Sequence, residues 1–229
     1  MNDDLRKDNE TNEQNDIVGG ESETAETEIN ENNEVQPEKQ TTFDKIYDWL
    51  EVMAVSAVIV ILTLTFLFRL STVDGTSMNN TLSHGDMLVI QNIYSAAQGD
   101  IVVVQQLDSL FDQPIVKRII AVGGQTLKID FPSWKVWVDG ELLDEDYVNR
   151  ENGKIMKYDD FLSIYGNVAT KVGSAYEMTI PEGYVFVMGD NRNHSSDSRS
   201  GYVGLVRENE ILGKVIFRLF PVVSAGPIK

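Results

Sequence analysis

The chain of 229 residues contains no cysteine and only two histidines. Without cysteine it cannot form a disulfide, a metal–thiolate site or a thiol nucleophile. His84 and His194 do not have a metal-ligand spacing, so we expect no zinc or other bound metal. No glycine-rich loop is followed by Lys-Ser or Lys-Thr, which leaves phosphate binding without a motif. The sequence therefore predicts no metal and no cofactor, and any chemistry must come from other side chains.

Positive charge is also scarce: 19 lysines and arginines stand against 36 aspartates and glutamates, for a formal net charge of -17. This balance argues against nucleic acid as a partner, because contacts to phosphate need a basic surface. Residues 1–42 hold thirteen acidic and three basic residues, and thus ten of the seventeen excess negative charges. No aromatic residue precedes Phe43, so this segment cannot bury enough apolar surface to offset its chain entropy. We expect a disordered acidic tail over residues 1–42.

A long apolar run follows the acidic segment. Residues 52–68 are seventeen consecutive residues without a charge, which is the short end of a membrane-spanning helix. A cleavable signal peptide is the first alternative, but the run begins more than fifty residues into the chain, behind an acidic leader. A buried core helix is the second, and such helices are rarely so uniformly apolar. We expect one uncleaved transmembrane anchor over residues 43–69. Its flanking basic residues, Lys45 and Arg69 among them, do not determine its orientation.

Beyond the anchor, the sequence has the pattern of a mainly β protein. Asp139-Gly140 between apolar flanks is a strong signal for a hairpin, and a second strand–turn–strand pattern surrounds residues 181–183. We expect an antiparallel β-sheet domain over residues 70–229, with a smaller inserted β lobe at about 127–180. β-branched runs bounded by Gly, Asp or Pro predict further strands at residues 86–91, 100–106, 114–122 and 211–220.

One serine and one lysine are the candidates for catalysis. Ser77 lies in a Gly-Thr-Ser turn shortly after the anchor, and Lys117 precedes Arg118 in an apolar strand pattern. Arginine stays protonated in proteins, so only Lys117 could act as a general base. On a strand it shares a face with Ile115 and Ile119, and burial there could lower its pKa to roughly 7 or 8, a change worth about 4 kcal/mol. The alternative, that Lys117 and Arg118 form a solvated strand edge, stays open from spacing alone.

The polar stretch of residues 188–201 is the third candidate region. A calcium loop starting at Asp190 fails, because Arg192 and Gly201 occupy the third and twelfth positions, where oxygen ligands are required. A flexible surface loop is possible for such a composition. Two aspartates and two arginines among small hydroxyl residues favour an internal network of charged side chains instead.

Together these motifs resemble bacterial type I signal peptidase, a membrane-anchored serine protease that removes signal peptides from exported proteins. The stretch from Gly189 to Arg199 fits the family's Gly-Asp-Asn-Arg-x-x-Ser-x-Asp-Ser-Arg pattern at every fixed position. The other matching motifs are Ser77-Met78 with Thr81-Leu82, Gly85-Asp86, and Lys117-Arg118. The resemblance covers the chain from the anchor to about Phe220 and leaves the acidic tail outside.

The resemblance implies a role for each matching residue. Ser77 is the nucleophile, Lys117 its general base, and Ser195 orients the lysine. It implies that the substrate binds as an added strand, with small side chains such as alanine at the first and third positions before the cut. The implied structural residues are Asp190, Arg192, Asp197 and Arg199, and the implied substrate-binding residues are Val73, Gly75, Met78, Ile115 and Val116.

The resemblance also implies a place in the cell. The acidic tail is expected in the cytoplasm and the catalytic domain outside, next to the lipid bilayer and the secretion machinery, with preprotein signal peptides as substrates. A single anchor is similar to the Gram-positive form of the family.

The sequence departs from the family pattern in three places. Asn80 stands where proline is usual, and Ala121, Gly123 and Gln125 replace the usual residues after the lysine. Gly75 stands where some members carry a hydroxyl, so the oxyanion hole would depend on the Ser77 backbone N–H. None of these changes removes a group that a Ser/Lys dyad needs.

Three competing hypotheses remain. A self-cleaving repressor of the LexA kind uses a similar Ser/Lys pair, but would need a DNA-binding module in place of the tail and anchor. A catalytically impaired, membrane-tethered binding paralogue would be expected to lack Ser77 or Lys117, and both are present. As a mechanistic alternative, His84 or His194 could act as the base.

Overall fold

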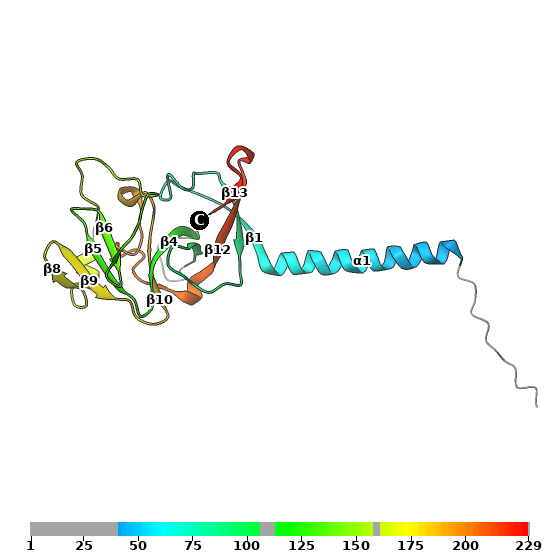
Figure 1. The fold of residues 1–229 in the computed structure, drawn as a ribbon, viewed down its shortest axis with the longest axis horizontal. Coiled ribbons are helices and arrows are strands. Elements are labelled where there is room, and N and C mark those ends of the chain that lie inside the picture. Colours follow the sequence, from blue (N-terminus) through cyan, green and yellow to red (C-terminus); the bar gives the residue numbers. More distant parts are fainter. Residues whose placement is uncertain (1–40, 106–112, 158–160, 229) are drawn as a thin grey trace, which may run out of the picture. The chain divides into compact units, whose positions relative to one another are not determined.

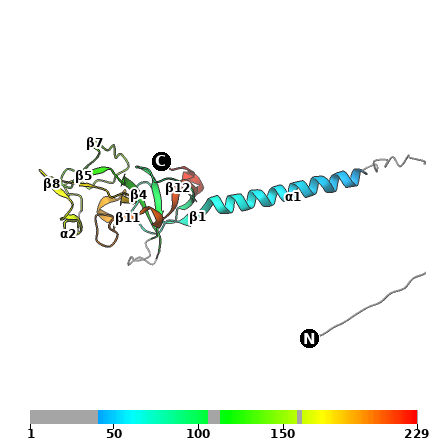
Figure 2. The ribbon, with the colours of Figure 1, turned by 90° about the horizontal axis from the view of Figure 1, so that it is seen from below.

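The computed structural model describes residues 41–105, 113–157 and 161–228. Nearly all of the expected acidic tail lies outside these residues. The first element, α1 (Thr42–Leu67), is one uninterrupted helix of 26 residues (Figures 1 and 2). Thr41 begins it with a reciprocal cap, because its hydroxyl accepts the Asp44 N–H and its own N–H donates to the Asp44 carboxylate. Among the described residues, α1 is the one helix long and apolar enough to cross a membrane, with a mean hydropathy of 2.4.

The helix ends two residues before the boundary expected for the anchor. Phe68 and Arg69 belong to β1 (Phe68–Thr72), which pairs antiparallel with β2 (Met87–Gln91). Phe68 lies opposite Gln91 and Thr72 opposite Met87. The backbone groups of Phe68 and Arg69 therefore belong to a sheet. Hydropathy alone does not predict whether apolar residues at the end of such a run are helix or strand.

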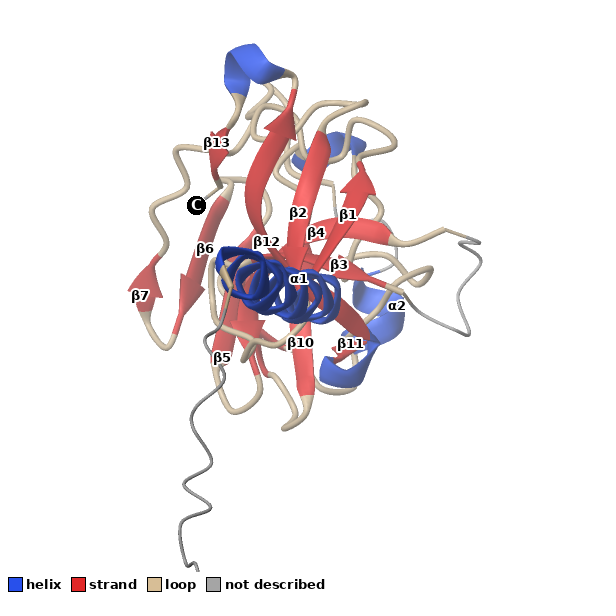
Figure 3. Cartoon of the chain, turned by 90° about the vertical axis from the view of Figure 1, so that its right-hand side faces the viewer, coloured by secondary structure: helices blue, strands red, loops and turns tan. Residues whose placement is uncertain are grey.

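Strands are the main regular elements after α1, and they form two antiparallel sheets (Figure 3). The first sheet has the order β1-β2-β12-β3-β4-β10-β11, with β13 on β12. Its longest strand, β12, pairs with β2 on one side and β3 on the other. The remaining bounds are β3 (Ile101–Val104), β4 (Ile115–Val122), β10 (Tyr184–Met188), β11 (Val206–Arg207), β12 (Ile211–Phe220) and β13 (Gly226–Pro227).

The second sheet has the order β7-β6-β5-β9-β8 and lies in the sequence between β4 and β10. Its hairpin turns at Asp139 and Gly140, whose φ angles of 52° and 86° are those of a type I′ turn. Figure 1 shows β6, β5, β9 and β8 side by side, as the pairing requires. The bounds are β5 (Thr126–Asp130), β6 (Lys135–Val138), β7 (Glu141–Leu142), β8 (Thr170–Val172) and β9 (Ala175–Thr179). The mainly β, antiparallel class expected from sequence is thus confirmed, with one apolar helix before it.

The turn at Pro181–Gly183 is not a hairpin. The strand before it, β9, pairs with β5 and β8, whereas the strand after it, β10, pairs with β4 and β11. The turn therefore carries the chain from the second sheet back to the first. Turn composition predicts that the chain bends there, but not which partner each flanking strand takes.

The two sheets share a hydrophobic core. Ile120 of β4 and Phe186 of β10 pack in the same buried cluster as Ile129 of β5 and Phe161. Phe161 lies in α2 (Phe161–Tyr165), and its ring contacts the Phe131 ring in a T-shaped arrangement, with the two ring centroids 5.3 Å apart. Three short 3₁₀ turns, Arg192–His194, Glu208–Glu210 and Val222–Ser224, complete the described elements. Because β4 and β10 are backed by this core, the residues they carry toward the site are held on rigid strands.

Candidate active site

Ser77 lies in the turn between β1 and β2. Val73 N–H donates to Asp86 O, and Gly85 N–H donates to Val73 O, both at 2.9 Å, which ties the start of the turn to its end. Met78 and Leu82 are fully buried in the core beneath. The serine is therefore displayed on a turn with fixed ends and an apolar base.

Lys117 of β4 contacts this serine directly. Its Nζ donates to Ser77 Oγ at 2.8 Å and to Val116 O at 3.0 Å. Only 3% of Lys117 is exposed, and Arg118 is equally buried, so the solvated strand edge is wrong. Burial lowers the pKa of Lys117 to about 8; the charge of Asp197 opposes this shift and that of Arg199 adds to it. A neutral amine in hydrogen-bond contact with a hydroxyl can accept its proton.

A cleft of about 420 Å³ opens beside Ser77 and Lys117. Residues 73–78 form one of its walls and residues 113–117 another, and His194 and Ser196 also line it. All five residues expected to bind substrate lie in these walls: Val73, Gly75, Met78, Ile115 and Val116. Gln113, Pro114, His194 and Ser196 were not expected, since they stand at variable positions of the motifs or outside them.

Both walls of the cleft have backbone groups without a strand partner. β4 pairs with β3 over Ile115–Arg118 but with β10 only from Arg118 onward, so the β10-side edge of Ile115–Lys117 is unpaired among the described residues. On the opposite wall, Val73 directs both its N–H and its C=O to residues 85 and 86. Asp74 makes no backbone hydrogen bond to a described residue. These two edges could accept an extended peptide between them.

The loop after β10 packs on the backbone of the serine. Asn191 N–H donates to Ser77 O at 2.9 Å, and Asn191 Nδ2 donates to Thr76 O at 3.0 Å. A Cβ on Gly189 would lie 2.5 Å from Ser77 O, so only glycine permits this approach. The Ser77 N–H itself makes no hydrogen bond to a described residue and is available to an oxyanion.

Ser195 lies in the same loop, with its Oγ 2.3 Å from the place a Gly189 Cβ would take. This hydroxyl is buried and has no well-formed hydrogen bond to a described residue, although it lies close enough to Asp197 to help lower the pKa of that carboxyl. Lys117 donates to Ser77 and Val116, and no bond joins it to Ser195. The orienting role implied by the family resemblance therefore stays a prediction.

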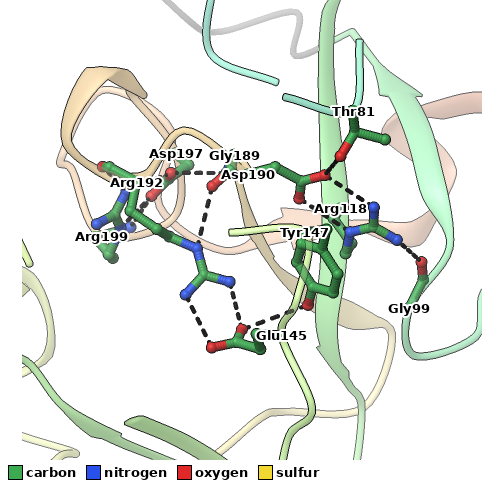
Figure 4. A network of polar contacts seen from close by, with 10 residues as sticks. All are labelled: Thr81, Gly99, Arg118, Glu145, Tyr147, Gly189, Asp190, Arg192, Asp197 and Arg199. Atoms are coloured by element: carbon green, nitrogen blue, oxygen red, sulfur yellow. Dashed lines mark hydrogen bonds and ion pairs between the residues drawn. The ribbon is translucent and has the colours of Figure 1, made fainter. Parts of the chain in front are cut away.

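Three buried arginines surround the site, each with a carboxylate partner (Figure 4). Arg199 pairs with Asp197, as an internal loop network would require. The other two pairs leave the loop: Asp190 binds Arg118 of β4 through two hydrogen bonds of 2.8 and 3.0 Å, and Arg192 binds Glu145. Of the two pairs that two aspartates and two arginines could form within residues 188–201, Asp197–Arg199 is present, whereas Asp190 and Arg192 take partners outside the loop.

Sequence reasoning missed Glu145 and Tyr147. The Tyr147 ring lies 4.0 Å from the guanidinium carbon of Arg118, and its hydroxyl donates to Glu145 (Figure 4). Both stand in an ordinary Asp-Glu-Asp-Tyr stretch, with Glu145 47 residues before Arg192, and no spacing rule links them to the loop.

Neither histidine makes a hydrogen bond to Ser77 Oγ. His84 Nδ1 accepts the Gly75 N–H at 3.3 Å and lies 3.2 Å from Asp74. His194 lines the cleft, and its Nε2 lies 3.4 Å from Glu151. The basic group in contact with the serine hydroxyl is the lysine.

Comparison with known proteins identifies similar chains. Residues 46–220 match the signal peptidase family, peptidase S26. A signal peptidase I of Bacillus licheniformis is 30% identical over 183 residues, covering 78% of this chain and 90% of that protein. A signal peptidase IB of Staphylococcus aureus strain COL is 33% identical over 181 residues, covering 77% and 91%. The crystal structure of a signal peptidase I from Enterococcus faecalis V583 shows 27% identity and a TM-score of 0.39, and covers 53% of this chain and 97% of that one.

Proposed function

The chain belongs to the signal peptidase family, peptidase S26, and we propose that it cleaves signal peptides from secreted preproteins with Ser77 as nucleophile and Lys117 as general base. The family that the motifs resemble is thereby confirmed, and with it the class of serine endopeptidase, signal peptidase I. The observation that carries the two residue roles is the 2.8 Å contact between a buried amine and the serine hydroxyl.

The reaction needs one proton carrier. Lys117, neutral in a fraction of molecules because burial lowers its pKa to about 8, accepts the Ser77 proton as Oγ attacks the scissile carbonyl. The Ser77 N–H donates to the developing oxyanion. Lys117 then protonates the leaving amine, and an acyl-enzyme forms. Water deprotonated by the same amine hydrolyses this ester and restores the serine.

The cleft suits an extended substrate with small side chains. A peptide lying between Asp74 and the open edge of Ile115–Lys117 can form backbone hydrogen bonds on both sides. Val73, Met78, Ile115 and Val116 give the cleft apolar walls near the serine. Shallow apolar walls favour alanine-sized residues at the first and third positions before the cut, the Ala-x-Ala type of site.

The buried ion pairs serve as supports in this proposal. Asp190 joins the loop to β4 through Arg118, and Asp197 holds Arg199 and the Gly189 N–H. Ser195 is proposed to turn toward the lysine and orient it when substrate fills the cleft.

The proposed cellular arrangement takes its anchor from the single apolar helix and its orientation from the family that the chain belongs to. We propose a cytoplasmic tail (1–42), a transmembrane anchor (43–69) and an extracytoplasmic catalytic domain (70–229) with the inserted lobe at about 127–180. Ser77 is ten residues past Leu67, the last residue of α1, so the chain between them can span at most about 33–36 Å. Secretion machinery in the same membrane would supply the preproteins.

Alanine variants at four positions test the dyad. In detergent, Ser77→Ala and Lys117→Ala should lose cleavage of a preprotein, whereas His84→Ala and His194→Ala should retain most of it. The reverse pattern would reject the lysine base. An intact wild-type protein that binds the preprotein but never cleaves it would favour the impaired paralogue instead.

A further inference from the structure

Glu145 is a buried carboxylate that no family motif includes. Its side chain is 1% exposed, and it lies in the segment that connects β7 to α2. Its carboxylate accepts hydrogen bonds from Arg192 Nη1 and Nη2 and from the Tyr147 hydroxyl. Its principal partner, Arg192, is itself fully buried, so the carboxylate and the guanidinium neutralise each other inside the protein (Figure 4).

Arg192 also contacts the backbone of the loop that packs against the nucleophile. Its Nε donates to Gly189 O at 3.2 Å, so the guanidinium joins Glu145 to the backbone of the loop. Gly189 packs against Ser77 O, and Asn191 donates to that same oxygen at 2.9 Å. Three contacts, from Glu145 to Arg192, from Arg192 to Gly189 and from Gly189 to Ser77, thus connect the Glu145 carboxylate with the backbone of the serine.

A second contact from the same segment holds the same loop. Asn149 N–H donates to Asp190 O at 3.1 Å, and Asn149 Nδ2 lies 3.5 Å from Asn191 Oδ1. The segment of residues 145–149 consequently contacts three consecutive loop residues, Asp190, Asn191 and Arg192. Such a series of contacts fixes the path of the loop more closely than an ion pair alone.

We propose that Glu145 is a positioning residue for the nucleophile, acting through Arg192 and the loop of residues 189–192 on the backbone of Ser77. This inference rests on the proposed role of Ser77. A buried ion pair is a poor device for stability alone, because well-packed apolar residues of similar size often serve as well or better. Placement of a reacting group matters more, since a shift of about 1 Å can cost roughly 100-fold in rate.

The test compares Glu145→Gln and Glu145→Ala in the full chain, purified in detergent, with a preprotein-derived peptide as substrate. We expect Glu145→Ala to lower kcat by about 10- to 100-fold while KM stays within about twofold, because the substrate walls are untouched and the nucleophile is displaced. Glu145→Gln keeps the shape and part of the hydrogen bonding, so its kcat should fall less than that of Glu145→Ala, by about three- to tenfold, and stay measurably below wild type.

Lys214→Gln is the matched control. It breaks another ion pair, Lys214 Nζ to Asp100 Oδ1 at 2.5 Å, which has no contact with residues 189–192, and its kcat should stay near that of wild type. Circular dichroism at the assay temperature ensures that only folded protein is compared. If Glu145→Ala does not fold, the kcat of Glu145→Gln alone tests the positioning role.

The inference is overturned if the folded Glu145 variants keep wild-type kcat, or if they raise KM with kcat unchanged. Ser77→Ala in the same assay separates the two proposals. Cleavage by Ser77→Ala would reject the proposed nucleophile, whereas an inactive Ser77→Ala beside fully active Glu145 variants would reject only the positioning role.

Discussion

Lys117 and Arg118 are neighbours on β4, equally buried, and differ in what faces their charge. Lys117 meets a neutral hydroxyl and a carbonyl, whereas Arg118 meets the Asp190 carboxylate through two hydrogen bonds and stacks on Tyr147. Without an ion-pair partner, burial lowers the pKa of the lysine to about 8. With a partner, the arginine stays charged and joins β4 to the loop. One strand therefore carries a base and a support side by side.

The largest loss of activity should come from replacing Lys117 with arginine, the residue type of its neighbour Arg118. Lys117→Arg keeps a positive charge at the serine but cannot release its proton near neutral pH. We expect cleavage to fall by roughly 100- to 10,000-fold, the range of general-base catalysis. Rates with a preprotein-derived peptide at pH 8 measure this, and a Lys117→Arg protein of near wild-type activity would show that no deprotonation is needed.

Removing a partner from one of the supports should be the next largest change. Asp197→Asn leaves Arg199, whose side chain is 3% exposed, without its carboxylate, which should lower the free energy of unfolding by about 3–5 kcal/mol. Chemical denaturation of the full chain in detergent measures the loss. As a control, Lys154→Gln breaks the exposed pair with Glu151 and should change stability by less than about 1 kcal/mol. Equal losses in the two variants would contradict a special role for the buried pairs.

Burial of Lys117 without an ion-pair partner should lower the free energy of unfolding. In the unfolded chain its pKa is 10.5, and burial lowers it to about 8, so below pH 8 the folded state carries the full cost of the buried charge. Lys117→Met should therefore raise the free energy of unfolding at pH 7, by up to about 3 kcal/mol at about 1.36 kcal/mol per pH unit. Wild-type stability should gain the same amount as pH rises from 8 to 10.5, and the Met variant should not.

Denaturation curves at pH 7 and pH 10 measure both effects. A Lys117→Met protein less stable than wild type at pH 7 would mean that the lysine has a stabilising partner after all.

The comparison also shows what could be predicted from sequence. The strand pattern predicts β4, and the different acid–base chemistry of lysine and arginine predicts which of the two residues can act as a base. The type I′ hairpin at Asp139-Gly140 was equally predictable, because both positions need a positive φ that few residues tolerate. These are local properties, decided by residues within a few positions of one another.

Long-range partners were beyond such reasoning. Asp190 pairs with Arg118, 72 residues away in the sequence, and Arg192 pairs with Glu145, 47 residues away. A carboxylate in the loop could have paired with either of the two nearby arginines, and composition does not rank them. For the same reason the turn at Pro181–Gly183 was predicted, but not that it joins two different sheets.

The pH dependence of kcat/KM tests the central claim most directly, since it reports the pKa of the free enzyme's base. Between pH 6 and pH 10 we expect a single ascending limb, tenfold per pH unit at its foot, with an apparent pKa of about 8, where burial places the pKa of Lys117. The limb should keep its position in His84→Ala and His194→Ala. A limb near pH 6.5 that disappears in a histidine variant, or a rate that levels off only above pH 10, would contradict a desolvated lysine as the base.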